Sequence, residues 1–391
     1  MSGTVRMTRV DSAWLRMDSD VNLMMIVGVW LLQPGVRYQA VRERIEQRLL
    51  RYPHEGGSAI VVRTHHSTGD GVSLTSVVLS IADGGALPSQ RSHDAAHVDD
   101  DLLTTTLIRP LTDLVLKSID LPDEGVTSAM DLVTHPQAGT RELTRTGLRV
   151  ANDLAALALM AHDSPTRLKG KPAGCKFVAW GEPLPLDIVK SVSKALNASI
   201  NDVLLSCVAG AIGEDPQGKA IRAMVPVNLR PLDEAHKLGN RFGLVPLVLP
   251  IGISNPIERV HAVHARMGDL KGSCQPVLAF GVLALAGLLN QSGQDALLGP
   301  FAKKATAVMT NRPGPTRLLE FCGSTLRHSI FWVPQSTDVA VGASIFSYGG
   351  GVQFAQITGR KLCPEPQKVV ERFAPELHKL LWLMLMLPRG A

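Results

Sequence analysis

Aromatic residues are scarce in this chain of 391 residues: five Trp, three Tyr and nine Phe make up only 4% of it. Lys and Arg do not gather into a block anywhere along the chain. Proteins that stack nucleic-acid bases need aromatic rings, and nucleic-acid tails need runs of basic residues. The sequence therefore argues against a nucleic acid as a partner. The net charge of +5 suits an anionic cofactor or a membrane surface but does not require one.

Cysteine pairs are absent too. No two of the five cysteines have the Cys-x-x-Cys spacing of a zinc or redox site; they are Cys175, Cys207, Cys274, Cys322 and Cys363. An odd number of widely separated thiols indicates neither a disulfide framework nor a zinc site, and it favours a reducing cytoplasm.

No apolar run is long enough to cross a membrane, which takes about 20 residues. Met1–Val21 also lacks the apolar stretch of a secretory signal. Leu23–Leu32 is typical of a buried strand, and the thirteen residues of Val277–Leu289 are typical of a core or interfacial helix. We expect a protein that is soluble or bound to a membrane surface.

Hydrophobic residues, in contrast, make up 45% of the chain, enough for a full core. The length predicts two to three domains of roughly 150 residues each, and the hydrophobic periodicity predicts two α/β halves with mixed sheets. Ser164–Gly174 holds two Pro, two Gly and three basic residues, a composition typical of a linker. We therefore divide the chain into an N-terminal domain (1–163), a linker (164–174) and a C-terminal domain (175–391).

The expected strands are Leu23–Leu32, Ser58–His65, Lys176–Trp180, Ala220–Val227, Phe242–Leu249, Thr306–Thr310, Ser324–Ser329, Val339–Ser347 and Val352–Thr358. The expected helices are Tyr38–Leu50, Val72–Ala82, Leu102–Ile119, Glu142–His162, Leu186–Leu196, Ile200–Ile212, Pro256–Leu270, Val277–Leu289 and Gln367–Leu387.

Several common catalytic motifs are missing, namely G-x-S-x-G, G-x-x-x-x-G-K-[ST], G-x-G-x-x-G and H-E-x-x-H. Serine hydrolases, P-loop nucleotidases, Rossmann dehydrogenases and zincins depend on these motifs. Each of these four interpretations therefore loses its main support.

The outstanding segment is His65-His66-Ser67-Thr68-Gly69-Asp70-Gly71, which lies between an apolar strand and a helix. A strand end holds side chains rigidly at a sheet edge, and an imidazole there can act as a general base because its pKa is about 6.5. Neighbouring residues of a strand point to opposite faces, so one histidine can face a cleft while the other packs. Asp70 could orient the loop or pair with an arginine. Two partly buried histidines and a helix-capping aspartate would give the same pattern, and the residues alone leave both interpretations open.

A second segment, Ser199–Asp202, opens an apolar helix. Ser199 at the N-cap and Asp202 three residues later form a capping box, and the helix dipole favours a carboxylate there. Capping is the simpler explanation of Asp202. Asn201 has a second interpretation, because a helix N-terminus aimed at a cleft would offer donors to a developing oxyanion.

His65-His66-x-x-x-Asp70-Gly71 resembles the HHxxxDG motif of coenzyme A-dependent acyltransferases, a superfamily that includes chloramphenicol acetyltransferase, plant BAHD enzymes and peptide-synthetase condensation domains. Further segments resemble, in the expected order, those of one bacterial group, the wax ester synthase/diacylglycerol acyltransferases: Asp11–Met17, Asn201–Leu204, Met224–Pro231, Leu238–Gly243, Asn311–Pro315 and Ser347–Phe354. The resemblance covers most of the chain, although the DFGWG stretch of the plant enzymes is absent.

The resemblance implies an α/β fold of two chloramphenicol-acetyltransferase-like domains with mixed β-sheets and an active-site tunnel at their interface. It also implies transfer of a fatty acyl group from acyl-CoA to diacylglycerol or a long-chain alcohol. His66 would be the general base, with His65 and Asp70 holding the loop. Asn201 and Gly71 would be the candidates for contact with the oxyanion or substrate. The transfer is direct, so the resemblance implies neither a metal nor a permanently bound cofactor.

Such apolar substrates imply a cytoplasmic enzyme at the inner face of the membrane or on lipid droplets. The candidate anchors are Val277–Leu289 and Leu380–Leu387, and for the second segment we expect burial in the core. Basic residues near the linker could attract the phosphates of CoA, although a solvated surface is the simpler explanation. These basic residues are Arg167, Lys169, Lys171 and Lys176.

Two alternatives share these motifs: an acyltransferase with another acceptor or a carrier-protein donor, and an internally truncated lipid-binding form without turnover. The second arises because family members have several tens of further residues, including a Pro-Leu-Trp motif, before the HHxxxDG strand. Here Arg51-Tyr52-Pro53 runs directly into His54. We therefore expect the strand that carries His66 to have an exposed face or edge.

Overall fold

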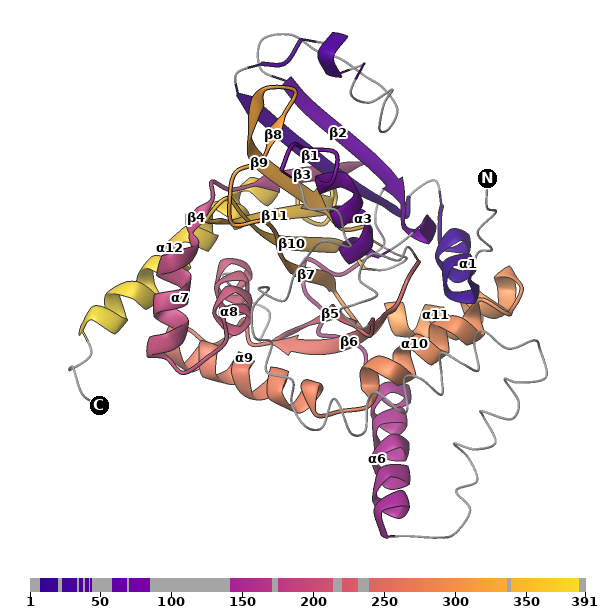
Figure 1. Ribbon diagram of the computed structural model, residues 1–391. Helices are drawn as coiled ribbons and strands as arrows, with labels where there is room; N and C mark the ends of the chain where they lie inside the picture. Colours follow the sequence, from indigo (N-terminus) through magenta and orange to yellow (C-terminus); the bar gives the residue numbers. More distant parts are fainter. Residues whose placement is uncertain are drawn as a thin grey trace.

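The computed structural model describes residues 8–19, 23–33, 35–37, 39–41, 43, 58–68, 70–84, 141–170, 175–213, 220–230, 239–335 and 339–386. Its strands are β1 (Met25–Gln33), β2 (Ser58–His65), β3 (Lys176–Trp180), β4 (Leu184–Pro185), β5 (Ile221–Asn228), β6 (Phe242–Leu249), β7 (Ala307–Pro313), β8 (Glu320–Phe321), β9 (Ser324–Trp332), β10 (Val341–Tyr348) and β11 (Gly351–Gly359). Its helices are α1 (Arg9–Arg16), α3 (Gly71–Leu79), α6 (Arg141–Ala158), α7 (Leu186–Ala195), α8 (Ile200–Ile212), α9 (Pro256–Lys271), α10 (Gln275–Ala286), α11 (Gln291–Ala302) and α12 (Pro366–Met386). Figure 1 shows their arrangement.

The larger sheet has seven strands in the order β3-β11-β10-β7-β5-β6, with β4 beside β11. It is mixed, as predicted, because β7 runs parallel to both β10 and β5 while the other pairs are antiparallel. Helices α7, α8, α9 and α12 pack together beside this sheet (Figure 1). Their apolar faces and the sheet share the largest hydrophobic core cluster, to which α8 contributes most of its side chains.

The smaller sheet has four strands in the order β2-β1-β9-β8. All its pairs are antiparallel, so the parallel pairs of the fold lie in the larger sheet. Two of its strands come from residues 320–332, so the C-terminal half of the sequence completes the sheet that carries His66. Strand β9 also packs on β10 and β11 of the larger sheet through Ile330 and Trp332.

Strand β2 lies at the edge of this smaller sheet among the described strands. Val61 in its centre is 58% exposed; an antiparallel sheet commonly has one solvated face, but that face normally carries polar residues. This agrees with the exposed face or edge expected from the shortened sequence before His54.

The helix predictions differ from the structure in several places. Helices α1 and α11 were not expected, and α10 begins and ends earlier than Val277–Leu289. The expected helix Leu102–Ile119 lies outside the described residues, and of Tyr38–Leu50 only 39–41 and 43 are described, all helical. No helix in the described ranges is long and apolar enough to span a membrane alone; α7 and α8 reach that length and hydropathy only together, with a bend of 101° between them.

The end of α12 is not core, which corrects the expectation for Leu380–Leu387. Leu380 is buried, but Trp382, Leu385 and Met386 are 66%, 64% and 80% exposed. The other candidate anchor, α10, is buried instead of exposed: Val277 and Phe280 both lie in the core. Helix α10 packs against α1 and β6, so it belongs to the core.

Candidate active site

His66 lies where β2 ends and a single 3₁₀ turn (His66–Thr68) leads toward α3. Its backbone N–H donates to the carbonyl of Met24 at 2.8 Å, which ties the turn to the beginning of β1. The strand and the turn therefore fix the backbone from which the imidazole projects.

The His66 ring is enclosed by aromatic side chains. It stacks on Trp14 with the ring centroids 4.4 Å apart and the planes 17° apart, and Phe242 lies 5.6 Å away. The residue is only 7% exposed, and Nδ1 is buried without a hydrogen-bond partner in the described structure. Burial lowers the pKa of His66 to about 4, against smaller opposing effects of its backbone hydrogen bond, Asp70 and Asn240. The ring is therefore neutral at pH 7, the form that accepts a proton.

His65, the last residue of β2, contacts the same turn through its imidazole ring. Its Nδ1 accepts the backbone N–H of Ser67 at 3.2 Å and lies 2.8 Å from the Ser67 hydroxyl. Because Nδ1 accepts, the ring proton sits on Nε2, which lies 3.6 Å from a carboxylate oxygen of Asp18. His65 thus contacts both the turn and the segment before β1, and its role as a positioning residue stays a prediction.

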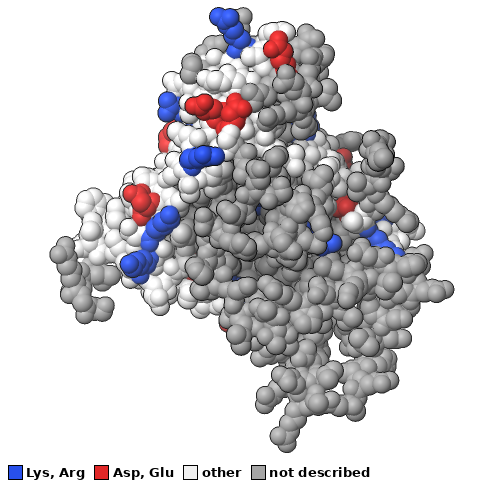
Figure 2. Space-filling model, viewed as in Figure 1, with Lys and Arg blue, Asp and Glu red and all other residues white. Residues whose placement is uncertain are grey.

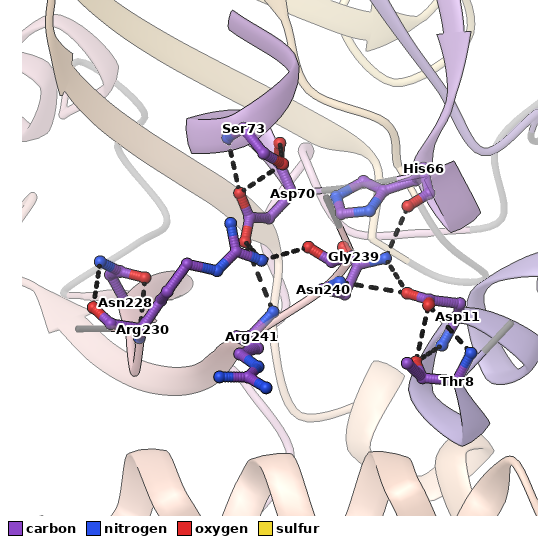
Figure 3. A network of polar contacts seen from close by, with 10 residues as sticks. All are labelled: Thr8, Asp11, His66, Asp70, Ser73, Asn228, Arg230, Gly239, Asn240 and Arg241. Atoms are coloured by element: carbon purple, nitrogen blue, oxygen red, sulfur yellow. Dashed lines mark hydrogen bonds and ion pairs between the residues drawn. The ribbon is translucent and has the colours of Figure 1, made fainter. Parts of the chain in front are cut away.

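Asp70 is a buried anchor at the N-terminus of α3. One carboxylate oxygen, Oδ1, accepts the backbone N–H and the hydroxyl of Ser73, at 2.8 and 3.1 Å. The other, Oδ2, lies 3.1 Å from the guanidinium of Arg230 and accepts the backbone N–H of Arg241 at 3.4 Å. The arginine partner anticipated for Asp70 is therefore present, and it comes from the segment after β5 (Figure 3).

Asn240 connects three separate parts of the chain. Its side-chain amide donates both to the carbonyl of His66 at 2.7 Å and to Oδ1 of Asp11 at 2.8 Å. Oδ2 of Asp11 accepts from Thr8 in the capping box of α1. As Figure 3 shows, Asn240 sits between α1 and the His66 turn. Gly239, whose φ of +103° favours glycine, donates to Thr68 and accepts from Asp70.

Sequence reasoning assigned no role to Asp11, Trp14, Arg230, Gly239 or Asn240. These residues appeared only inside segments that carried the family resemblance. Their partners are distant in sequence: Asn240 is 174 residues from His66 and 229 from Asp11. The only local signal was the Thr8–Asp11 capping box, which predicts a helix start but not a contact with His66.

Asn201 and Asp202 stand at the N-terminus of α8. Asp202 accepts the backbone N–H of Ser199, and the Ser199 hydroxyl accepts that of Asp202, so the predicted capping box is confirmed. Asn201 accepts from Asn311 of β7 at 3.1 Å, and no described contact joins it to His66. The next residue of β7, Arg312, donates from its guanidinium to the hydroxyl of Ser76 in α3. Gly71 begins α3, and a Cβ there would meet no described atom within 4 Å.

The basic residues near the linker are partly committed to the protein itself. Lys169 donates to the carbonyl of Ala305 at 3.0 Å. Lys176 begins β3, and burial lowers its pKa to about 8. Lys171 lies outside the described residues. In the part of the chain that the structure covers, no three His, Cys, Asp or Glu side chains form a group that could hold a metal ion.

Comparison with known proteins gives the same assignment for both halves of the chain. Residues 54–204 match the wax ester synthase/diacylglycerol acyltransferase catalytic domain, and residues 238–381 match the WS/DGAT C-terminal domain. The first match begins at His54, directly after the junction at which the chain looks shortened.

Curated relatives and solved structures agree with these matches. The probable diacylglycerol O-acyltransferase tgs1 of Mycobacterium tuberculosis is 23% identical over 308 residues, 76% of this chain and 62% of that relative. The chain therefore spans less than two thirds of that relative's length. The tgs2 protein of the same organism is 24% identical over 84% of this chain and 71% of its own length.

The wax ester synthase/diacylglycerol acyltransferase of Marinobacter aquaeolei VT8 has a similar structure, with a TM-score of 0.60 and 16% identity over 97% of this chain and 100% of that one. The first condensation domain of the calcium-dependent antibiotic synthetase gives a TM-score of 0.55 at 11% identity, covering 98% of this chain and 96% of that one. These likenesses show the fold predicted from the motifs. With both domain matches in sequence order, the chain belongs to the wax ester synthase/diacylglycerol acyltransferase family.

Proposed function

We propose that this protein transfers a fatty acyl group from acyl-CoA to the hydroxyl of diacylglycerol or a long-chain alcohol, with His66 as general base. One observation carries this proposal: four motif segments meet around the neutral, buried imidazole of His66. They are Asp11–Met17, His65–Gly71, Met224–Pro231 and Leu238–Gly243. Trp14 stacks on the ring, and Asn240 holds its backbone carbonyl. A general base needs a fixed position and the unprotonated form, and His66 has both.

In the proposed reaction, the imidazole of His66 takes the proton of the acceptor hydroxyl as its oxygen attacks the thioester carbonyl carbon. The tetrahedral intermediate then collapses, the carbon–sulfur bond breaks, and the imidazolium returns its proton to the CoA thiolate. Atoms and charges balance without an acyl-enzyme or a metal. Asn201 and Gly71 remain the proposed contacts for the oxyanion or substrate, and the two-domain division with an interfacial tunnel remains part of the same proposal.

His65 and Asp70 serve as positioning residues in this account. His65 is held by Ser67, and Asp70 is saturated by Ser73 and Arg230. A carboxylate with its oxygens engaged in this way stabilises the loop and does not need to exchange protons. The order of importance for the chemistry is therefore His66 first, with the other two acting through it.

Association with a membrane or droplet surface is the second part of the proposal. The acyl chain and the acceptor both partition into lipid, so the enzyme has to collect them at an interface. The exposed Trp382, Leu385 and Met386 at the end of α12 suit such a surface, because Trp favours the interface and Leu and Met favour the apolar side.

The test is incubation of the purified chain with radiolabelled palmitoyl-CoA and a panel of acceptors: diacylglycerol, hexadecanol, short alcohols and an acyl-accepting amine. Thin-layer chromatography separates the products. The proposal expects labelled triacylglycerol or wax ester and no amide. Transfer to the amine alone, or transfer only from a carrier-protein thioester, would favour the related acyltransferase activity instead.

A further inference from the structure

A cavity of about 400 Å³ lies on the C-terminal half of the chain, away from the His66 network. It is an open pocket bordered by the C-terminal half of α7, the start of α8 with the turn before it, and the second half of α9. We call it the α7–α9 pocket; its lining includes Lys194, Asn197, Ser199, Asp202, His264 and Lys271. Its volume is in the range of small-molecule sites, roughly 300–1,000 Å³.

Two ammonium groups stand at this pocket without partners. Lys194 and Lys271 are exposed, and neither makes a hydrogen bond or ion pair within the described ranges. Lys271 follows His264 by seven residues on α9, so both project from the same face of that helix. Figure 2 shows both basic and acidic side chains on the left of the molecule, so the sign of the charge at the pocket follows from its lining residues. The rim of the pocket therefore carries uncompensated positive charge.

The only acidic lining residue, Asp202, has its charge already engaged. Its Oδ2 accepts the backbone N–H of Ser199 at 2.9 Å and Nδ1 of His264 at 2.7 Å. The Asp202 side chain is only 3% exposed, whereas that of His264 is 53% exposed. A carboxylate accepts and does not donate, so Nδ1 of His264 carries a proton. Asp202 thus fixes the orientation of His264, and its single buried carboxylate faces two lysines in the same lining.

This fixed orientation leaves Nε2 of His264 for a ligand. The two nitrogens lie on different sides of the imidazole ring, and Nδ1 is committed to Asp202. When protonated, Nε2 is a donor beside the two lysines, and Asn197 and Ser199 add polar groups. Several donors of positive or neutral character around one space match the oxygens of a phosphate group, which accept multiple charge-assisted hydrogen bonds.

We propose that the α7–α9 pocket binds a phosphate group, with Lys194, Lys271 and His264 as its contacts. The volume exceeds that of phosphate alone and leaves room for an attached group, either the nucleotide portion of a coenzyme or the headgroup of a phospholipid. Both sources present the same chemistry to the three basic side chains. The inference does not depend on acyl transfer, because it concerns residues outside the His66 network.

The experiment measures binding to the whole chain by calorimetry and by flotation. The soluble probes are inorganic phosphate and adenosine 3′,5′-bisphosphate; the lipid probes are phosphatidylglycerol and phosphatidylcholine vesicles. The test variant is Lys194→Gln/Lys271→Gln, and its control is Lys190→Gln, which removes an exposed charge from α7 outside the pocket lining. All these side chains are exposed, and a melting curve for each variant checks that the fold is kept.

We expect the double variant to bind the preferred phosphate probe about tenfold more weakly or worse, and the Lys190→Gln control to bind it as the parent does. Binding of the bisphosphate assigns a soluble ligand, and binding of phosphatidylglycerol but not phosphatidylcholine vesicles assigns a headgroup. A His264→Gln variant should weaken the same probe. The proposal is overturned if no probe binds the parent chain, or if the double variant and the control bind equally well.

Discussion

At the scale of single residues, the two neighbouring histidines have different surroundings: His66 is buried among aromatic rings, and His65 makes hydrogen bonds. The rings of His66, Trp14 and Phe242 form a cluster with their centroids 4.4 to 5.6 Å apart, whereas His65 contacts Ser67 and Asp18. Adjacent residues at a strand end point in different directions, which is why two identical side chains meet such different surroundings. The low pKa of His66 follows from this burial.

The first prediction concerns stability and pH. The pKa of His66 is about 4 in the folded state against 6.5 for the unperturbed group. Above pH 6.5 both states hold a neutral ring and the contribution to stability is complete. As the pH falls from 6.5 to 4, the unfolded chain gains a proton that the folded chain does not. Stability should therefore drop by about 3 kcal/mol over this window.

Urea denaturation at a series of pH values measures this drop, with His66→Gln as the comparison. Other titrating groups are common to both proteins, so the difference between the two curves isolates His66. The stability of the parent relative to His66→Gln should fall by about 3 kcal/mol as the pH is lowered from 6.5 to 4. Parallel curves between pH 6.5 and 4 would show that His66 is not buried as described.

The second prediction assigns the desolvation of His66 to Trp14. Trp14→Ala should admit water to the ring and raise the pKa of His66 from about 4 toward 6.5, whereas Trp14→Phe should keep most of the shift. NMR titration of the histidine ring signals, with His66 assigned through His66→Gln, measures this directly. Leu15→Ala, an exposed position on the same helix, serves as control. An unchanged pKa in Trp14→Ala would exclude this role.

At the scale of elements, short helices and loops are held by partners that are distant in sequence. Helix α1 has only eight residues, too few to be stable alone. It is docked by Arg16, which donates to the carbonyls of Gly287 and Leu289 just after α10, and by the close approach of its backbone to Gly287. A Cβ at Gly287 would collide with the carbonyl of Arg9. Helix α3 is held in turn by Asp70 and Arg230.

The third prediction tests the anchor of α3. Asp70→Asn keeps an acceptor for Ser73 but removes the buried ion pair between Asp70 and Arg230, so the free energy of unfolding should fall by about 3 kcal/mol or more. Activity should fall together with stability. Asp187→Asn, in the exposed first turn of α7, should change neither. An inactive Asp70→Asn protein of unchanged stability would point instead to a direct chemical role for Asp70.

The fourth prediction concerns the exposed end of α12. Replacing Leu385 and Met386 by Ser should weaken flotation with lipid vesicles about tenfold or more, because full burial of each such side chain contributes about 1.5–3 kcal/mol. Leu159→Ser is the matched control, since Leu159 is 83% exposed just beyond α6. Equal loss in both variants, or no loss in either, would exclude the end of α12 as the anchor.

At the scale of the whole molecule, local sequence signals predicted elements far better than contacts between them. Helix α8 was predicted residue for residue because Ser199 and Asp202 mark its start and an apolar run follows. Helix α11 escaped prediction because Gly299 and Pro300 lower its helix propensity. The Asn240–His66 and Asp70–Arg230 contacts join segments far apart in the chain, and periodicity carries no information on such pairs. The motif resemblance supplied the segments but not their geometry.

The fifth prediction concerns the junction at Pro53–His54. Among the described strands, β2 is an edge and its Val61 is exposed, so a segment that covers this face should stabilise the smaller sheet. Inserting the corresponding residues of a longer family member after Pro53 should raise both the melting temperature and palmitoyl transfer, and the chain as it stands should be weakly active or inactive. Equal stability and equal activity of the two forms would show that the shorter sheet is already complete.

The central claim is that a neutral His66, fixed by four converging segments, is the general base of acyl transfer. The most direct test measures CoA release and labelled product from palmitoyl-CoA and the preferred alcohol, for the chain and for its insertion form, each with His66→Ala and His65→Ala. The account predicts that His66→Ala lowers turnover by about 10²–10⁴-fold in every active form while the protein stays folded, and that His65→Ala costs less. Folded His66→Ala protein with turnover close to that of its parent would contradict the account.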